Sequence, residues 1–197
     1  MTASVLPAEV RSVWRQFLID REFARNYTLG YLDHPGPAAK NPVAERLLPS
    51  LLHVKAVAIL DHAFRAWIEE RELTVPRKPY GTDLHGRIDF LADNSFLGDR
   101  ESLHSIRDTR NDIAHEPAEE IAWERLDQDV LVIAAALRVL GLVDEMPMWE
   151  VFSERSSARE GEIPNALASF HYRIAIKAAE GLVAEITWQT HLMRDNA

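Results

Sequence analysis

Apolar residues recur at helical spacing in two long segments of the N-terminal half of the chain. The first segment, 7–32, begins with Pro7, which suits the first turn of a helix. The proline-rich segment 33–37 then interrupts the pattern. The sequence therefore predicts a first helix over 7–32, with one apolar face made of Val10, Trp14, Phe17, Leu18, Ala24, Thr28 and Tyr31.

The second segment, 43–73, follows the start signal Asn41-Pro42 and predicts a longer helix. Pro49 indicates a kink or a restart within it. Asp61 lies on a secondary apolar stripe, one turn after Val57. Because a buried carboxylate is costly unless it is paired, Asp61 is expected to form an ion pair. The main apolar stripe comprises Leu52, Ala56, Ile59, Leu60, Ala63 and Trp67.

Three shorter segments also have helical periodicity. A short helix is predicted from Thr82 or Asp83 to Ala92, and a further helix over 99–115. After Pro117 the pattern resumes and predicts a fifth helix over 119–140, which Gly141 terminates. The resulting prediction is a mainly α, up-and-down bundle of about five helices over 1–143.

The periodicity changes from 3.6 to 2 near the C-terminus. The segment 144–164, whose residues 153–164 are polar, is interpreted as a linker. After it, apolar and polar residues alternate on both sides of Ala178-Ala179-Glu180-Gly181. This alternation predicts a β-hairpin over 165–197 with one apolar face. A helix through 165–193 is the alternative. A lone hairpin is marginally stable in water, so it is expected to pack on the helices or on a partner.

Composition narrows the class of protein. The net charge of −9 argues against a broad, non-specific nucleic-acid binder. The chain has no cysteine, and thus no disulfide framework and no thiolate metal site. No apolar run is long enough for a membrane span, and the N-terminus lacks the features of a signal peptide. We therefore expect a cytoplasmic protein that does not act at a membrane.

Several common chemistries have no support in the sequence. There is no Gly-x-Ser-x-Gly elbow, no glycine-rich phosphate loop, and no His-Glu-x-x-His or His-x-x-x-His pair. His104 and Asp108 are spaced to share a helix face, but this arrangement is typical of an exposed pair. We therefore predict no metal and no cofactor.

The segment 107–117 contains the most informative residues. Arg110 lies on the apolar stripe of its helix, between Ile106 and Ile113, where an apolar residue is expected. Pro117 disfavours helical geometry at the preceding residue, so the helix must end near His115. Arg110 and His115 are five residues apart, about 140° around a regular helix. They can converge only through a frayed helix end or by facing a second copy of themselves.

The run Arg110-Asn111-Asp112-Ile113-Ala114-His115 resembles the Arg-x4-6-His motif of the HEPN superfamily, in its Arg-Asn-x-x-x-His form. The two long preceding helices are similar to those of this family, as is the acidic residue Asp61 in the second. The resemblance covers about residues 7–141. It implies a metal-independent endoribonuclease that acts as a homodimer on RNA. It also implies a role as a toxin or antiviral defence effector, with an antitoxin or regulatory protein as partner.

In that interpretation, Arg110 stabilises the charged phosphate, Asn111 orients the ring or the phosphate, and His115 transfers a proton. Asp61 is expected to orient Arg110 through an ion pair, and Asp112 is a further supporting residue. Two alternatives remain open. Arg110 can simply be buried against Asp61 while Asn111 and His115 cap the helix. The chain can also be a non-catalytic binding or scaffold module that holds a protein or nucleotide.

Overall fold

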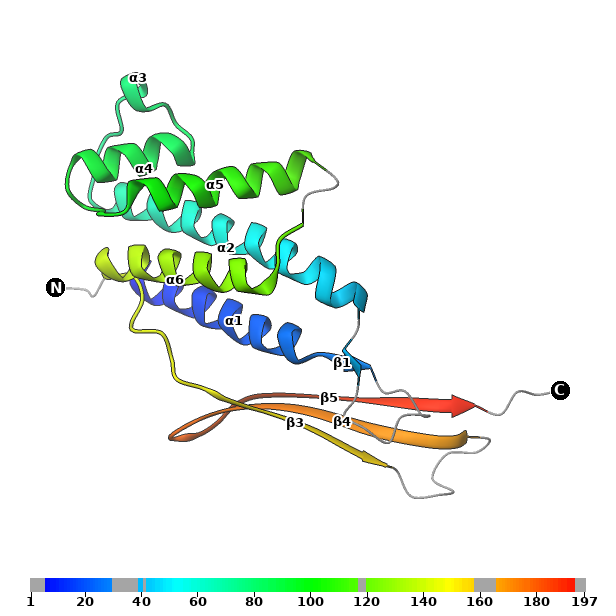
Figure 1. The fold of residues 1–197 in the computed structure, drawn as a ribbon. Coiled ribbons are helices and arrows are strands. Elements are labelled where there is room, and N and C mark those ends of the chain that lie inside the picture. Colours follow the sequence, from blue (N-terminus) through cyan, green and yellow to red (C-terminus); the bar gives the residue numbers. More distant parts are fainter. Residues whose placement is uncertain (1–5, 30–38, 41, 117–119, 158–165, 194–197) are drawn as a thin grey trace. The chain divides into compact units, whose positions relative to one another are not determined.

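The protein is described by a computed structural model that covers residues 6–29, 39–40, 42–116, 120–157 and 166–193 (Figure 1). The chain divides into two compact units, which are described one at a time. The helical unit comprises Met1–Leu18 and Arg46–Met146, and the sheet unit comprises Ile19–Glu45 and Pro147–Ala197. The predicted mainly helical fold is confirmed. The sheet unit also takes in residues 19–29, 39–40 and 42–45, which the sequence had assigned to the helical domain.

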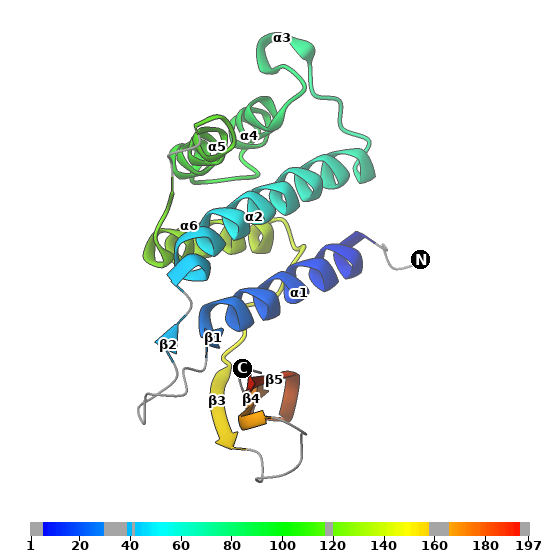
Figure 2. The ribbon, with the colours of Figure 1, turned by 90° about the vertical axis from the view of Figure 1, so that its right-hand side faces the viewer.

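Six helices occur in the part of the chain that the structure describes: α1 (Leu6–Asn26), α2 (Pro42–Glu70), α3 (Arg77–Tyr80), α4 (Leu84–Asp93), α5 (Arg100–His115) and α6 (Trp123–Val139). In the helical unit, α2 and α6 run side by side, as do α4 and α5 (Figures 1 and 2). No helix among the described residues is both long enough and apolar enough to span a membrane.

The helix α2 is continuous through Pro49, so of the two alternatives expected there, a kink or a restart, the restart does not occur. Both of its predicted apolar stripes are buried, which matches a helix that is enclosed on most sides. At its C-terminal end the amide of Leu73 donates to the carbonyl oxygen of Ile68, and Glu72 has a positive φ of 54°. The left-handed conformation of Glu72 ends the helix. It turns the following amide back toward a carbonyl oxygen that would otherwise lack a partner.

Two helix boundaries differ from the sequence prediction. The first helix ends at Asn26 and not at residue 32, because the Asn26 side chain donates to the Glu22 carbonyl oxygen and Tyr27 leaves the helix. Tyr27 packs against Trp188 of the sheet unit, with ring centroids 5.4 Å apart. The last helix begins at Trp123 and not at residue 119; residues 117–119 lie outside the described part, and the preceding Ile121 amide donates to Ser50 Oγ.

The sheet unit contains a three-stranded antiparallel sheet in the order β3 (Glu150–Ser157), β4 (Ala166–Ala178), β5 (Gly181–Met193). The predicted hairpin is thus present as β4 and β5, with Ala178 paired to Gly181 at the turn. Its apolar face is also confirmed, since Tyr172, Ile174 and Ile176 are buried. The sheet unit has in addition a short antiparallel pair, β1 (Thr28–Leu29) with β2 (Ala39–Lys40).

The strand β3 corrects the prediction that 144–164 is only a linker. Its residues are mostly polar, and Phe152 is exposed, so neither alternation nor apolar content distinguishes it from a loop. It pairs with β4 along its full length, from Glu150 opposite Lys177 to Ser157 opposite Phe170. The strand therefore depends on backbone pairing with β4 more than on burial of its own side chains.

An arginine-lined pocket beside the Arg-Asn motif

The helix α5 holds the motif residues in a regular helical conformation. It starts at the N-cap residue Asp99, whose carboxylate accepts from the Ser102 amide at 3.2 Å. It ends at His115, as predicted. Glu116 is extended, with φ −114° and ψ 102°, and its amide donates to the Asp112 carbonyl oxygen at 2.7 Å. Asp112 thus contacts Glu116 through its backbone, and Asp112 itself is exposed.

Arg110 and Asn111 line a pocket of about 370 Å³ formed by residues of α2, the start of α4 and α5. The Arg110 Nη1 group donates to Asn111 Oδ1 at 3.1 Å, which fixes the guanidinium beside the amide. Both residues are partly buried. The other lining residues are Val57, Ala58, Asp61, His62, Arg65, Asp83, Leu84, His85, Arg87 and Arg107.

Asp61 lies at this pocket, but its ion pair is with Arg87 and not with Arg110. The Arg87 Nε group donates to Asp61 Oδ1 at 3.1 Å, and Nη2 also contacts that oxygen. Arg87 further donates to the Thr82 carbonyl oxygen at 2.6 Å, so it is held from two sides. The predicted pairing of Asp61 with Arg110 is therefore corrected: the first turn of α4 brings a different arginine to the carboxylate.

The pocket has an excess of positive charge. Four of its lining residues are arginines and two are aspartates. Arg87 neutralises Asp61, and Arg107 pairs with the neighbouring Asp108. Within the described residues, Arg65 and Arg110 make no ion pair with a carboxylate. Two guanidinium groups at one pocket are therefore available for an anion, and a guanidinium suits a phosphate because it can donate two parallel hydrogen bonds.

The second pocket carboxylate, Asp83, is held by the backbone. It is the N-cap of α4 and accepts a hydrogen bond from the Gly86 amide at 3.0 Å. That hydrogen bond lowers the pKa of Asp83 below its usual value, although burial acts in the opposite direction. Asp83 is thus a charged cap for α4 at neutral pH.

His115 is separate from the pocket within one chain. It is the last residue of α5, it is exposed, and it is not among the residues that line the pocket. The structure thus joins Arg110, Asn111 and Asp61 at one pocket and leaves His115 outside it. This agrees with the helical geometry, in which Arg110 and His115 point about 140° apart.

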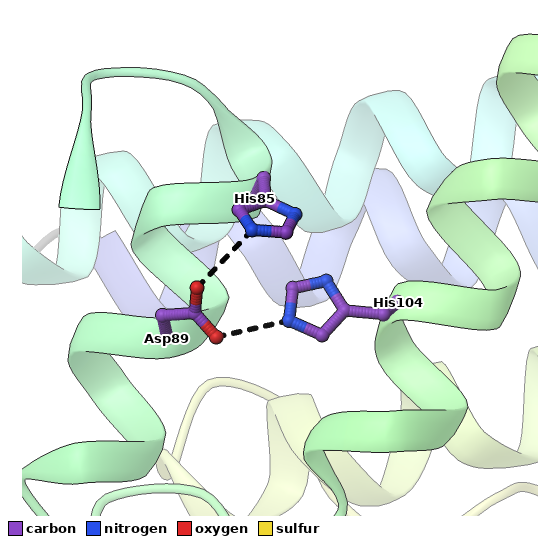
Figure 3. Close-up of side chains that lie close together, drawn as sticks. All are labelled: His85, Asp89 and His104. Atoms are coloured by element: carbon purple, nitrogen blue, oxygen red, sulfur yellow. Dashed lines mark hydrogen bonds and ion pairs between the residues drawn. The ribbon is translucent and has the colours of Figure 1, made fainter. Parts of the chain in front are cut away.

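Sequence reasoning missed a cluster of two histidines and a carboxylate next to the pocket. Asp89 lies between His85 and His104 (Figure 3), with Oδ2 3.2 Å from His85 Nε2 and Oδ1 3.0 Å from His104 Nε2. These are the residues that the structure brings together as possible metal ligands. The spacing of His85 and Asp89 on α4 was a detectable signal, but the partner His104 comes from another helix.

The chain was compared with protein-family models, with curated proteins and with solved structures, and none of these comparisons found a match.

Proposed function

We propose that the chain is a metal-independent endoribonuclease of the HEPN type that acts as a homodimer, with Arg110, Asn111 and His115 of two chains around one RNA phosphate. The observation that carries the proposal is the pair of arginines, Arg65 and Arg110, that line one pocket without a carboxylate partner among the described residues. Such groups bind a phosphodiester and stabilise the additional charge of its transition state.

The position of His115 supports a site shared by two chains. A proton-transfer group must reach the reacting oxygen, either directly or through one water. His115 lies outside the pocket that Arg110 lines, at the exposed end of α5. A two-fold axis near this helix end brings the His115 of one chain to the Arg110 of the other. It also supplies two histidines, one to act as a base and one as an acid.

The proposed reaction is an internal transfer. One histidine removes the proton of the ribose 2′-hydroxyl, and the 2′-oxygen forms a bond to the adjacent phosphorus. The bond from phosphorus to the 5′-oxygen breaks, and the second histidine donates a proton to that oxygen. The products are a 2′,3′-cyclic phosphate and a 5′-hydroxyl. No metal ion takes part in any step, since the arginines stabilise the charge.

The direct test is an RNA cleavage assay in EDTA with wild type, His115→Ala and Arg110→Ala. We expect wild type to produce cyclic phosphate ends, and each variant to lose at least about a hundredfold in rate. His171→Ala, an exposed histidine of β4, is the matched control and should cleave like wild type. Intact RNA with wild-type dimer, or equal cleavage by His115→Ala, overturns the proposal. As a toxin or defence effector, wild type should also impair growth on expression, and His115→Ala should not.

A second candidate function follows from the same pocket. Because four arginines line a pocket that does not include His115, a single chain can bind a nucleotide without any catalysis. This is the binding-module alternative. It predicts that a nucleoside triphosphate binds to wild type and His115→Ala with equal affinity, and more weakly to Arg65→Gln and Arg110→Gln. Calorimetric titration of the four proteins distinguishes this function from RNA cleavage.

A further inference from the structure

We propose that His85, Asp89 and His104 form a binding site for a divalent transition-metal ion that joins α4 to α5 (Figure 3). His85 and Asp89 are one turn apart on α4, and His104 is on the second turn of α5. The proposal does not depend on the proposed RNA cleavage. It assigns the three side chains a structural role beside the pocket and no step in that reaction.

The distances within the cluster are close to the spacing of ligands around a metal. Zn²⁺ lies about 2.0–2.2 Å from nitrogen and oxygen ligands, so two ligands of a tetrahedral ion are about 3.3–3.6 Å apart. The Asp89 oxygens are 3.2 Å from His85 Nε2 and 3.0 Å from His104 Nε2. One ligand atom can be chosen from each of the three residues so that all three atoms lie within 4.8 Å of one another. An ion can therefore enter between them after small side-chain adjustments.

The chemistry of the ligands selects the class of metal. Two imidazole nitrogens and one carboxylate suit Zn²⁺, Co²⁺, Ni²⁺ or Fe²⁺, whereas Mg²⁺ and Ca²⁺ prefer oxygen ligands alone. Three protein ligands leave at least one position for water. His104 and Asp89 are partly buried on their helices, while the half-exposed His85 is the route of access.

Neighbouring side chains define the competition for Asp89. The Arg100 Nε group is 3.7 Å from Asp89 Oδ1, and Arg100 is also paired with Asp93. The rings of His85 and His104 are tilted against each other with centroids 4.4 Å apart. The cluster thus positions both imidazoles at the Asp89 carboxylate. A metal ion must compete with Arg100 for that carboxylate.

Binding at this cluster has a mechanical consequence for the pocket. His85 is a metal ligand in the proposal and also lines the pocket that Arg110 lines. The helix α5 carries both His104 and Arg110. An ion that joins His104 to α4 therefore holds the first turn of α4, which lines the pocket, against α5. The ion should therefore stabilise the helical unit without contact with Arg110.

The test uses the full chain without a polyhistidine tag, after EDTA treatment and desalting. Thermal unfolding is followed while ZnCl₂ is added, and CoCl₂ is added in parallel to record visible absorption. We expect one ion to bind per chain and the Tm to rise with metal concentration. We also expect the visible absorption bands that are typical of Co²⁺ with a low coordination number. His104→Gln and His85→Gln should each weaken binding by more than about a hundredfold, since even outer-shell partners of a ligand contribute about 10–100-fold.

His171→Gln is the matched control, because it removes an exposed histidine outside the cluster. It should bind like wild type, and Arg100→Gln should bind more tightly than wild type. Each variant is compared with and without metal, so a loss of basal stability does not obscure the result. If His104→Gln fails to fold, His85→Gln still provides the test, because His85 is exposed. The proposal is overturned if metal does not raise the Tm of wild type. It is also overturned if metal raises the Tm of both ligand variants as much as that of wild type.

The two proposals fail separately. RNA cleavage in EDTA tests the endoribonuclease, and the metal-dependent Tm tests the cluster. Cleavage that survives EDTA alongside a Zn²⁺-dependent Tm supports both proposals. Cleavage without any Tm shift overturns the metal site alone.

Discussion

His53 on α2 and Asp129 on α6 form a buried hydrogen bond, with 3.0 Å between His53 Nε2 and Asp129 Oδ2. The His53 side chain is completely buried. Asp129 also accepts from Arg125 Nε, and the Nη2 group of Arg125 donates to Ser105 Oγ on α5. One carboxylate therefore links three helices, including the helix that carries the Arg-Asn motif. Burial alone raises the pKa of Asp129, but the hydrogen bonds from His53 and Arg125 outweigh it and hold that pKa below its ordinary value of 3.8.

Asp129→Asn should lower the free energy of unfolding by about 2–4 kcal/mol at pH 7, because it removes the charge that His53 and Arg125 contact. A carboxyl with a lowered pKa stabilises the fold above the pKa of the unfolded chain, and this contribution is lost as the pH falls through the folded pKa. The difference from wild type should therefore be constant from pH 7 to about pH 5 and shrink below about pH 4.

Urea unfolding of both proteins across this pH range measures the effect. Asp144→Asn is the control, since Asp144 is an exposed partner of Arg11 and should change stability by less than about 1 kcal/mol. A difference between wild type and Asp129→Asn that persists unchanged at pH 3 would show that packing, and not charge, is responsible.

Gly86 is confined by the chain that leads into α4. A Cβ atom added there would lie 1.8 Å from the Tyr80 carbonyl oxygen, closer than any real contact. Alanine normally stabilises a helix by about 1 kcal/mol relative to glycine. Here we expect Gly86→Ala to destabilise the protein by at least about 2 kcal/mol, because backbone must shift. Gly98→Ala meets no atom within 4 Å and should change stability by less than about 1 kcal/mol. Equal midpoints of thermal unfolding for the two variants would contradict this account.

The sequence was sufficient wherever a local rule determines the structure. Pro117 acts on the residue before it, so the end of α5 at His115 followed from the chain alone. The alternation around Ala178 likewise predicted β4 and β5, because a buried sheet face requires a period of two. The strand β3 was missed since its mostly polar residues provide no such period, and its structure depends on a distant partner strand.

The candidate site was harder to predict because its contacts join different helices. Asp61 was expected to pair with Arg110, but the orientation of α4, which periodicity does not give, brings Arg87 to it. The cluster around Asp89 likewise requires α4 to lie beside α5 in a particular register. Sequence spacing identifies neighbours on one helix, and it does not identify which faces of two helices meet.

Tyr172 stacks on Trp188 within the sheet, with ring centroids 5.1 Å apart, and its hydroxyl is buried without a hydrogen-bond partner in the described structure. A buried polar group without a partner is costly, so Tyr172→Phe should leave stability unchanged or raise it by up to about 1 kcal/mol. Tyr172→Ala should lower it by about 3–5 kcal/mol through the cavity that it creates. Chemical denaturation of both variants tests the pair, and a clear loss in Tyr172→Phe would indicate a hydroxyl partner.

Heterodimers test whether the proposed catalytic site belongs to two chains. Chains that carry Arg110→Ala and His115→Ala are coexpressed with different tags and purified through both. If Arg110 of one chain acts with His115 of the other, this heterodimer retains one working arginine–histidine pair. It should cleave RNA at least about tenfold faster than either variant homodimer, since proton transfer contributes about 10²–10⁴ to the rate. Its rate should still remain below wild type, because one histidine is missing.

The matched control is a heterodimer of wild type with a chain that carries both substitutions. It has the same number of arginines and histidines, but they are all on one chain. With a shared site, this control lacks the arginine–histidine pair across the two-fold axis and should be slower than the heterodimer of single variants. The reverse order of rates would show that Arg110 and His115 act within one chain, through a rearranged end of α5.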